Sequence, residues 1–187
     1  MTYESMLEFL DGFFESNRNS YGLRCRTLLD IGCGKGYFVE ELRKKGILAE
    51  GLDLCPRRGY KHLHRGDAKN LKECFGKRKF DVITANGVLG YGGQLETLLI
   101  LDRKKAERLM ESGSKEFAKE CKEGAIAILR SCYEQLNSPG LFLNSEDNYQ
   151  LDSVTYTKKD AKEIGFSPLG LNKNGSVMIK PPRLARR

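Results

Sequence analysis

The residues with the clearest capacity for chemistry lie in the segment Asp30-Ile31-Gly32-Cys33-Gly34-Lys35-Gly36. An apolar run at 27–31 leads into this segment, and a helical pattern follows it. Glycine lacks a Cβ atom, so a ligand can approach the backbone closely at such a loop. The first turn of the helix also leaves N–H groups without partners inside the helix. A strand, a glycine-rich loop and a helix in this order predict a nucleotide-cofactor site.

Two further acids stand where a second and a third strand are expected to end. Asp53 follows Gly32 by 21 residues, and a carboxylate at about this spacing accepts hydrogen bonds from ribose hydroxyls in Rossmann-type sites. Asp67 belongs to Gly66-Asp67-Ala68, where a carboxylate can accept a hydrogen bond from an adenine amino group. The same aspartate is an equally good cap for the helix that follows it.

The order of the glycines distinguishes two classes of cofactor. Dinucleotide sites read G-x-G-x-x-G and place a pyrophosphate over the helix N-terminus. In this chain Tyr37 occupies the third glycine position, and the observed order is G-x-G-x-G with Asp30 two residues before it. S-adenosylmethionine has no phosphate and carries a sulfonium, an amino group and a carboxylate, so an acid close to the loop suits it. The pattern therefore favours S-adenosylmethionine.

These residues require a sheet that brings several strand ends together. Helical patterns separate four apolar runs, which lie at 27–31, 47–54, 60–65 and 80–84. Alternation of this kind predicts βαβ units and a parallel sheet.

The second half of the chain is organised differently. A helical excursion covers 86–137, and its apolar pattern predicts a helix that starts at Leu95. Its densely charged part, 103–123, is either a lid over the site or a solvated helix pair. Ser138-Pro139-Gly140 is expected to end the excursion in a turn. The expected elements after it are a strand at 141–143, a helix at 158–164 that Thr157 caps, and an antiparallel pair at 167–171 and 176–180.

Composition predicts a single domain over 1–187, with an amphipathic helix within 1–20 and a basic tail at 181–187. No run of about 18 apolar residues occurs, so we expect no membrane span. The N-terminus lacks a signal-peptide pattern and the six cysteines form no C-x-x-C pair, which predicts a cytoplasmic protein with reduced thiols and no metal site. The net charge of +7 attracts phosphates but specifies little by itself.

These segments together resemble the class I S-adenosylmethionine-dependent methyltransferases over nearly the whole chain. LLDIGCGKGYFVEEL resembles the first motif of the family, EGLDL its second-strand acid, and RGDAKNL its adenine motif. FDVITANGVLGY is similar to the fourth strand and its loop, and LNSPGLFL to the turn before the fifth strand, with Leu141 in place of a glycine. The resemblance implies a Rossmann-like α/β fold. Its sheet would have seven mostly parallel strands in the order 3-2-1-4-5-7-6, with strand 7 antiparallel and helices on both faces.

The resemblance also implies roles for individual residues. The methionine part of the cofactor would border the glycine loop, Asp53 would hold the ribose hydroxyls, and Asp67 would face adenine. The residues expected to bind S-adenosylmethionine or its product S-adenosylhomocysteine are Asp30, Gly32, Cys33, Gly34, Gly36, Asp53, Leu54, Asp67, Ala68 and Asn86. Tyr91 follows Leu89-Gly90 near the mouth of the site and is either a substrate contact or a packed loop tyrosine.

Methyl transfer from a sulfonium is an in-line displacement, for which alignment can suffice, so no catalytic residue is assigned. Asn86-Gly87-Val88-Leu89 departs from the Asn/Asp-Pro-Pro-Tyr/Phe motif of enzymes that methylate glutamine or adenine, which argues against those acceptors. The compact chain favours a small-molecule acceptor. The alternatives are an RNA or protein acceptor, with Lys77-Arg78-Lys79 and residues 183–187 as phosphate contacts, or a non-catalytic module that only binds S-adenosylmethionine.

Overall fold

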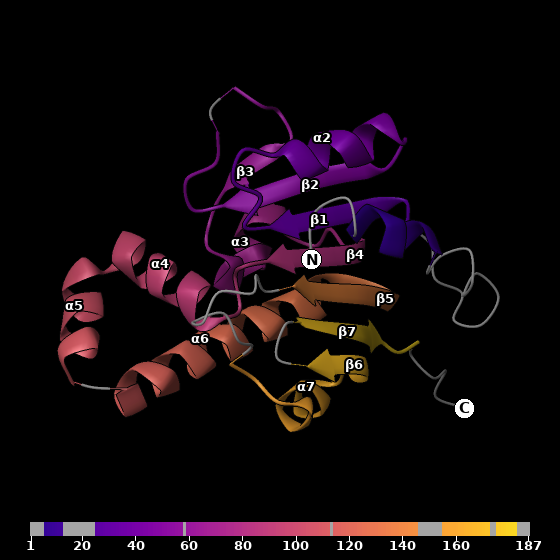
Figure 1. The fold of residues 1–187 in the computed structure, drawn as a ribbon. Coiled ribbons are helices and arrows are strands. Elements are labelled where there is room, and N and C mark those ends of the chain that lie inside the picture. The colour runs from indigo at the N-terminus through magenta and orange to yellow at the C-terminus, as the bar shows by residue number, and fades with distance from the viewer. Residues whose placement is uncertain are drawn as a thin grey trace.

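The computed structural model describes residues 6–12, 25–57, 59–112, 114–145, 155–172 and 175–182. Its strands are β1 (Thr27–Ile31), β2 (Leu48–Asp53), β3 (Leu63–Arg65), β4 (Phe80–Asn86), β5 (Leu136–Ser145), β6 (Ser167–Asn172) and β7 (Gly175–Lys180). They form one sheet of order β3-β2-β1-β4-β5-β7-β6, in which β7 runs antiparallel to both of its neighbours (Figure 1). The other pairings are parallel. The expected Rossmann-like α/β fold is confirmed, including the strand order.

The helices are a segment at 6–12, α2 (Tyr37–Lys44), the 3₁₀ turn η1 (Ala68–Asn70), α3 (Leu71–Phe75), α4 (Tyr91–Leu101), α5 (Arg103–Ser112), α6 (Ser114–Gln135) and α7 (Lys158–Ile164). Thr157 and Asp160 form the expected capping box at the start of α7. Among the described residues, no helix is long and apolar enough to cross a membrane. The predictions for 1–5, 13–24 and 183–187 lie outside the described residues.

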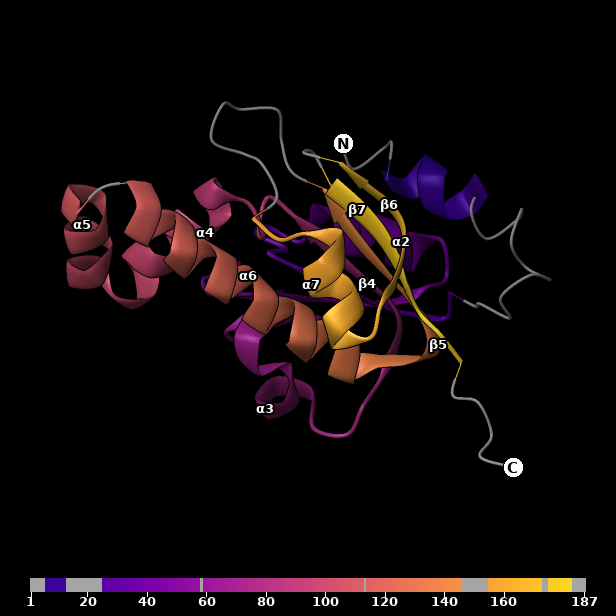
Figure 2. The ribbon, with the colours of Figure 1, turned by 90° about the horizontal axis from the view of Figure 1, so that it is seen from below.

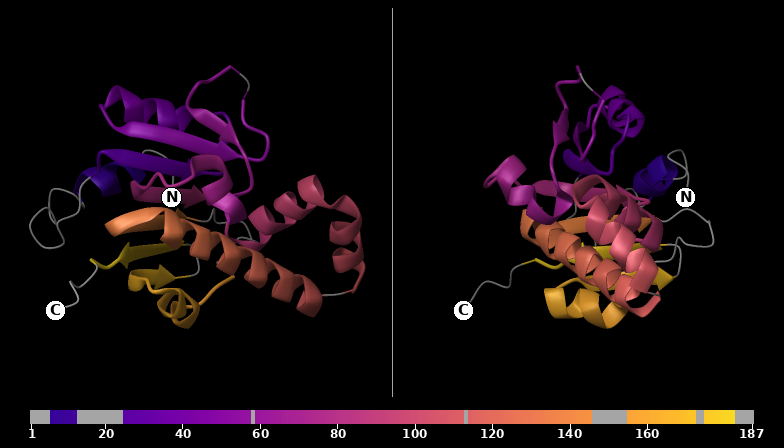
Figure 3. Two further views of the ribbon diagram at one scale, coloured as in Figure 1. Left: turned by 180° about the vertical axis from the view of Figure 1, so that it is seen from behind. Right: turned by 90° about the vertical axis from the view of Figure 1, so that its left-hand side faces the viewer.

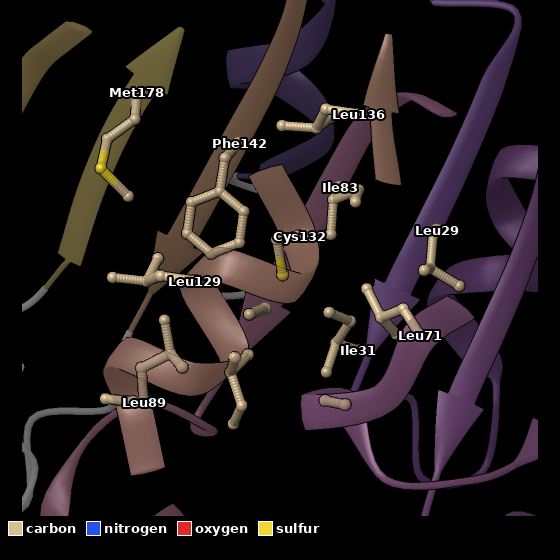
Figure 4. Packing of buried hydrophobic residues seen from close by; sticks show 14 of the residues in the cluster. Leu29, Ile31, Leu71, Ile83, Leu89, Leu129, Cys132, Leu136, Phe142 and Met178 are labelled. Atoms are coloured by element: carbon tan, nitrogen blue, oxygen red, sulfur yellow. The ribbon is translucent and has the colours of Figure 1, made fainter. Parts of the chain in front are cut away.

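Helices cover both faces of the sheet, so β1 and β4 are buried on both sides and are apolar at most positions. On one face, α3, α6 and α7 pack against residues such as Ile83, Phe142 and Met178 (Figure 4). On the other face, α2 and the helix at 6–12 bury Phe38 and Met6 among others. The two cores fix β1, β2 and β4 side by side, and with them the loops that follow these strands.

The helical excursion forms an arm, which we define as α4, α5 and residues 114–123 of α6. The arm extends beyond the carboxyl ends of the parallel strands, whereas the second half of α6 returns along the sheet (Figures 1 and 2). Its helix α4 is apolar on nearly all sides, with Leu99, Ile100 and Leu101 exposed. The arm therefore stands next to the edge at which a parallel α/β sheet binds its ligands.

Three boundaries differ from the sequence prediction. The turn expected at Ser138-Pro139-Gly140 lies within β5, as a bulge between the pairs Phe80–Leu136 and Val82–Leu141. Pro139 has no N–H to donate to a neighbouring strand, so the chain bulges there and resumes pairing afterwards. The third strand is shorter than 60–65, because a turn in which Leu63 N donates to Tyr60 O precedes it. Helix α4 begins at Tyr91, whereas the apolar pattern indicated a start near Leu95.

Candidate functional site

A cavity of about 290 Å³ lies at the carboxyl ends of β1, β2 and β4, beside α4. Its described lining residues come from six places in the chain: the glycine loop, the end of β2, the segment Gly66–Ala68, the end of β4 with its loop, helix α4 and helix α6. This is the position that an open α/β sheet offers to a ligand, because neighbouring strands end there and their loops diverge.

The glycine loop rests on β2 and presents bare backbone to the cavity. The amides of Gly32 and Cys33 both donate to Leu52 O, at 2.8 and 3.3 Å, which fixes the turn against the neighbouring strand. Gly34 has φ +50°, and a Cβ atom built there would meet no atom within 4 Å. A ligand can therefore reach the main chain at Gly34 without a side chain in the way.

Asp53 connects the end of β2 to this loop. Its Oδ2 accepts a hydrogen bond from Gly34 N at 2.9 Å, and its Oδ1 accepts one from Cys55 N at 2.8 Å. The carboxylate therefore faces the glycine turn and lines the cavity, as the spacing of 21 residues predicted. Each oxygen keeps a further lone pair, so the carboxylate can accept more hydrogen bonds.

Asp30 lies buried beneath the loop, with 1% of its surface exposed. Its Oδ1 accepts a hydrogen bond from Thr84 Oγ1 at 2.7 Å, whereas its Oδ2 has no partner. Burial raises the pKa of Asp30 to about 7; the bond from Thr84 opposes the rise, and the nearby charge of Asp53 adds to it. An unpaired acceptor of this kind is costly unless a donor reaches it.

On the far side of the cavity, Asp67 caps η1 through Oδ1, which accepts from Lys69 N at 2.9 Å. The capping role that the sequence left open is thus present. Asp67 also lines the cavity together with Ala68 and Leu54, so capping uses one carboxylate oxygen and leaves the other available.

The end of β4 supplies a second unpaired acceptor. Asn86 lines the cavity, and its buried Oδ1 has no hydrogen-bond partner. The loop after it is held in place on both sides, because Gly87 N donates to Ser145 O and Gln94 Nε2 donates to Val88 O, each at 2.8 Å. The Val88 side chain occupies the space that a Cβ on Gly32 would need, so the two loops are in close contact.

Besides the buried Asp30, three of the residues predicted from the sequence, Cys33, Gly36 and Tyr91, are absent from the described cavity lining. The Cys33 side chain is buried in the core beside Gly51, and a Cβ on Gly36 would collide with Leu63. These two positions shape the loop through packing. Tyr91 begins α4, and its ring lies 6.2 Å from the ring of Phe117, outside the described cavity lining.

Helix α4 contributes lining residues that no sequence pattern indicated. Gly93, Glu96, Thr97 and Ile100 all line the cavity, and Ile128 of α6 joins them. A Cβ on Gly93 would lie 2.1 Å from Gly87 O, so only glycine lets the first turn of α4 approach the loop after β4. The glycine pair at 92–93 was the available sequence signal for this contact. By itself, however, such a pair is also typical of a loop, and only the structure shows that Gly93 packs against Gly87. Among the described residues, no group of three or more His, Cys, Asp or Glu side chains could hold a metal ion.

A family model described as a methyltransferase domain matches residues 4–163. No curated protein matches the chain. The fold is similar to that of an S-adenosylmethionine-dependent methyltransferase from Clostridium acetobutylicum, with a TM-score of 0.58 and 16% identity over 97% of this chain and 93% of that one.

Two further solved structures share the fold. DesVI of Streptomyces venezuelae has a TM-score of 0.60 and 15% identity over 96% of this chain and 92% of that one. CalS10 of Micromonospora echinaspora, an amino pentose methyltransferase solved with S-adenosylmethionine bound, has a TM-score of 0.56 and 12% identity over the same shares. Because the family model spans most of its length, the chain belongs to the class I S-adenosylmethionine-dependent methyltransferases.

Proposed function

We propose that the chain binds S-adenosylmethionine in this cavity and transfers its methyl group to an acceptor that enters beside α4. The observation that carries the proposal is the sign of the charges. Every charged side chain among the described lining residues is an acid, namely Asp53, Asp67 and Glu96, and Asp30 lies just beneath. Such surroundings favour a sulfonium and an ammonium group, and they repel the pyrophosphate of a dinucleotide.

The chain's residues divide the cofactor between them. Gly32 and Gly34 lie against the methionine part, and Asp53 accepts hydrogen bonds from the ribose hydroxyls with its remaining lone pairs. Asp67 uses its free oxygen for the adenine amino group, beside Ala68 and Leu54. Three observations support this assignment: the bare backbone at Gly34, the bonds from Gly34 N and Cys55 N to Asp53, and the free oxygen of Asp67.

The two unpaired acceptors explain how the charged end is held. Asp30 Oδ2 and Asn86 Oδ1 are buried and lack donors, so both are suited to N–H groups of a ligand. We assign the ammonium group of the methionine part to this pair. Cys33 and Gly36 contribute by fixing the loop, because the side chain of one and the close packing of the other face the core.

S-adenosylmethionine supplies a methyl group that its positively charged sulfur has already activated. The chain's task is therefore to hold the donor in line with the acceptor and to exclude water. A general base is needed only for an acceptor that must lose a proton. Glu96 is the carboxylate that α4 presents on the acceptor side, and in the described lining no histidine competes for that role.

Helix α4 is the part of the excursion that acts as a lid, since it supplies four lining residues. The charged segment 103–123 behaves as a solvated helix pair. Its ion pairs, Arg103–Glu107 at 2.8 Å and Lys105–Glu120 at 2.6 Å, satisfy charges within the arm, and none of the described residues of α5 lines the cavity.

The first candidate acceptor is a small molecule, which would approach the methyl group beside Glu96 and Thr97 of α4. A second candidate is a nucleic-acid acceptor. It is favoured by one observation, the concentration of the chain's net positive charge in residues 57–79, next to the adenine side of the cavity.

Calorimetry with two glycine variants tests the donor assignment. Gly34→Val fills the open space at the loop, and we expect it to abolish binding of S-adenosylhomocysteine. Gly46→Val is the matched control: Gly46 also has positive φ, at +83°, and open space around its Cβ position, but it lies at the end of α2, outside the described cavity lining. Both variants carry similar backbone strain, so a difference between them reports the cavity.

A thermal shift provides the second readout. At about 100 times its Kd, S-adenosylhomocysteine stabilises the folded chain by about 2.7 kcal/mol, which corresponds to a rise in Tm of roughly 5–10 °C for a domain of this size. We expect this rise in the wild type and in Gly46→Val. Binding of NAD, with no response to either sulfur ligand, would refute the proposal.

A further inference from the structure

The net positive charge of the chain is concentrated in one segment. Residues 57–79 contain nine lysines and arginines against two acids, a net charge of +7. The whole chain also carries +7, so the remaining residues contain 23 basic and 23 acidic side chains and are neutral together. A distribution of this kind differs from a uniformly basic surface, because anions are attracted mainly to residues 57–79.

The segment connects β2 to β4 and forms one edge of the molecule. It comprises β3, the edge strand of the sheet, together with η1, α3 and the loops between them, and η1 and α3 pack against α6 (Figures 1 and 3). Its described cations are exposed, apart from the half-buried Lys69. Arg65 and Lys69 immediately flank the cavity-lining tripeptide Gly66–Ala68.

Most of these cations have no acidic partner. Arg78 is engaged by the buried carboxylate of Glu50, and Lys79 donates to the carbonyl of Glu134. Within the part of the chain that the structure describes, six others form no ion pair: Arg57, Lys61, Arg65, Lys69, Lys72 and Lys77. The arm has a different balance of charge, since its seven cations stand among seven acids and four of them, Arg103, Lys105, Lys119 and Lys122, form ion pairs.

An aromatic ring stands among the unpaired cations. The guanidinium of Arg57 lies 5.2 Å from the centre of the Tyr60 ring, which is 36% exposed. Rings and guanidinium planes of this kind stack with the bases of single-stranded nucleic acids. The segment's α3 has only five residues, too short to read a duplex groove as recognition helices do. The combination suits an unpaired strand better than a duplex.

We propose that this basic edge binds a single-stranded nucleic acid along the side of the cofactor cavity. The phosphates contact the six unpaired cations, and a base stacks on Tyr60. The proposal makes the nucleic-acid acceptor of the proposed function more specific. That the strand is a methyl acceptor rests on the proposed function, but binding of the strand by itself requires no cofactor.

The number of contacts predicts the salt dependence. If all six cations meet phosphates, the logarithm of the affinity falls with the logarithm of the salt concentration with a slope of about −4, and raising salt from about 50 to 200 mM weakens binding roughly 300-fold. A strand held mainly by stacking would show a much smaller slope.

Fluorescence anisotropy with a labelled oligouridine RNA of about 20 nucleotides measures this slope. The triple variant Lys61→Glu/Arg65→Glu/Lys72→Glu removes half of the unpaired cations, and we expect its slope to fall to about −2. The matched control is Lys104→Glu/Arg108→Glu/Lys115→Glu, which changes the net charge equally at exposed positions of the arm. The control keeps the wild-type slope if the basic edge is the binding surface. Tyr60→Ala weakens binding with an unchanged slope.

Binding of S-adenosylhomocysteine, measured by calorimetry on the same samples, separates this proposal from the proposed function. Wild-type affinity for the cofactor product in both triple variants shows that they are folded and that only the strand surface has changed. The proposal is wrong if the two triple variants lose RNA affinity equally. It is also wrong if the protein prefers duplex to single strands, or if it binds phosphatidylserine vesicles but no oligonucleotide.

Discussion

The buried carboxyl of Asp30 gives the stability of the protein a specific pH dependence. Its pKa rises from 3.8 to about 7 because burial disfavours the charged form. Between about pH 4 and pH 7 the folded state therefore holds a proton that the unfolded chain has released. Stability falls as pH rises through this window, by about 1.4 kcal/mol per unit and by about 4 kcal/mol in all, and stays level above it.

Asp30→Asn removes this titration and keeps the shape of the side chain. The difference in unfolding free energy, variant minus wild type, should increase by about 4 kcal/mol between pH 4 and pH 8. Urea denaturation followed by circular dichroism at several pH values measures it, and the subtraction cancels the other titrating groups. Thr84→Val is a companion variant. The Thr84 hydroxyl donates to Asp30 at 2.7 Å and lowers the pKa of that carboxyl, so its removal should raise the pKa and extend the window above pH 7.

A difference between Asp30→Asn and wild type that stays constant across the range would refute this reasoning. It would mean that the carboxyl ionises normally, and hence that water or another donor reaches Oδ2. The carboxyl carbon shift of Asp30 in ¹³C NMR gives the same pKa without unfolding the protein. A midpoint near 4 by that measurement would contradict the burial argument independently.

Three further outcomes are expected. Asp53→Ala should weaken binding of S-adenosylhomocysteine, measured by calorimetry, roughly 10- to 100-fold. Its control is Asp81→Ala, which removes a carboxylate that accepts from Arg26 N and Thr27 N at the opposite end of β1. The control should lower the free energy of unfolding by about 1–3 kcal/mol and leave the affinity for S-adenosylhomocysteine unchanged. Because a ligand ammonium beside Asp30 favours its ionised form, S-adenosylmethionine should bind more tightly at pH 8 than at pH 5.5 in the wild type and equally at both in Asp30→Asn; an equal pH effect in both proteins contradicts the placement. Iodoacetamide should modify the exposed Cys55 first in the folded protein, while Cys33, whose pKa burial raises to about 12, reacts only after unfolding, as peptide mass spectrometry can follow.

The structure reproduces those parts of the fold that local patterns control. The run at 27–31, the glycines after it and Asp53 each follow from the chemistry of a strand, a turn and a strand end, and all three lie where the sequence indicated. The antiparallel end of the sheet follows from the Asn-Gly pair at 174–175, whose flanking strands pair as expected. Such features are predictable because a few neighbouring residues determine them.

Contacts between segments that are distant in the sequence could not be predicted from local patterns. The start of α4 depends on Gly93 meeting Gly87 and Val88, and the bulge in β5 depends on how it pairs with β4. Likewise, no local pattern indicates that Cys33 faces the core or that Tyr91 packs on Phe117. The lining residues Glu96, Thr97 and Ile100 belong to α4, and no local pattern indicates that this helix lies beside the cavity and packs against α6.

The amino-acid sequence by itself determined the cofactor loop and the acids around it, because each is set by residue type and short-range spacing. The strand order was predicted only through the resemblance to a known family, because pairing between distant strands has no local signal. Tertiary structure alone decided which of these groups lack partners and which surface holds unpaired charge. Asp30 and Asn86 are ordinary polar residues in the sequence, and only packing removes the water that would otherwise satisfy them. In the same way, only the folded chain shows that these six cations of the basic edge form no ion pair among the described residues, whereas Arg103, Lys105 and Lys119 of the arm meet glutamates.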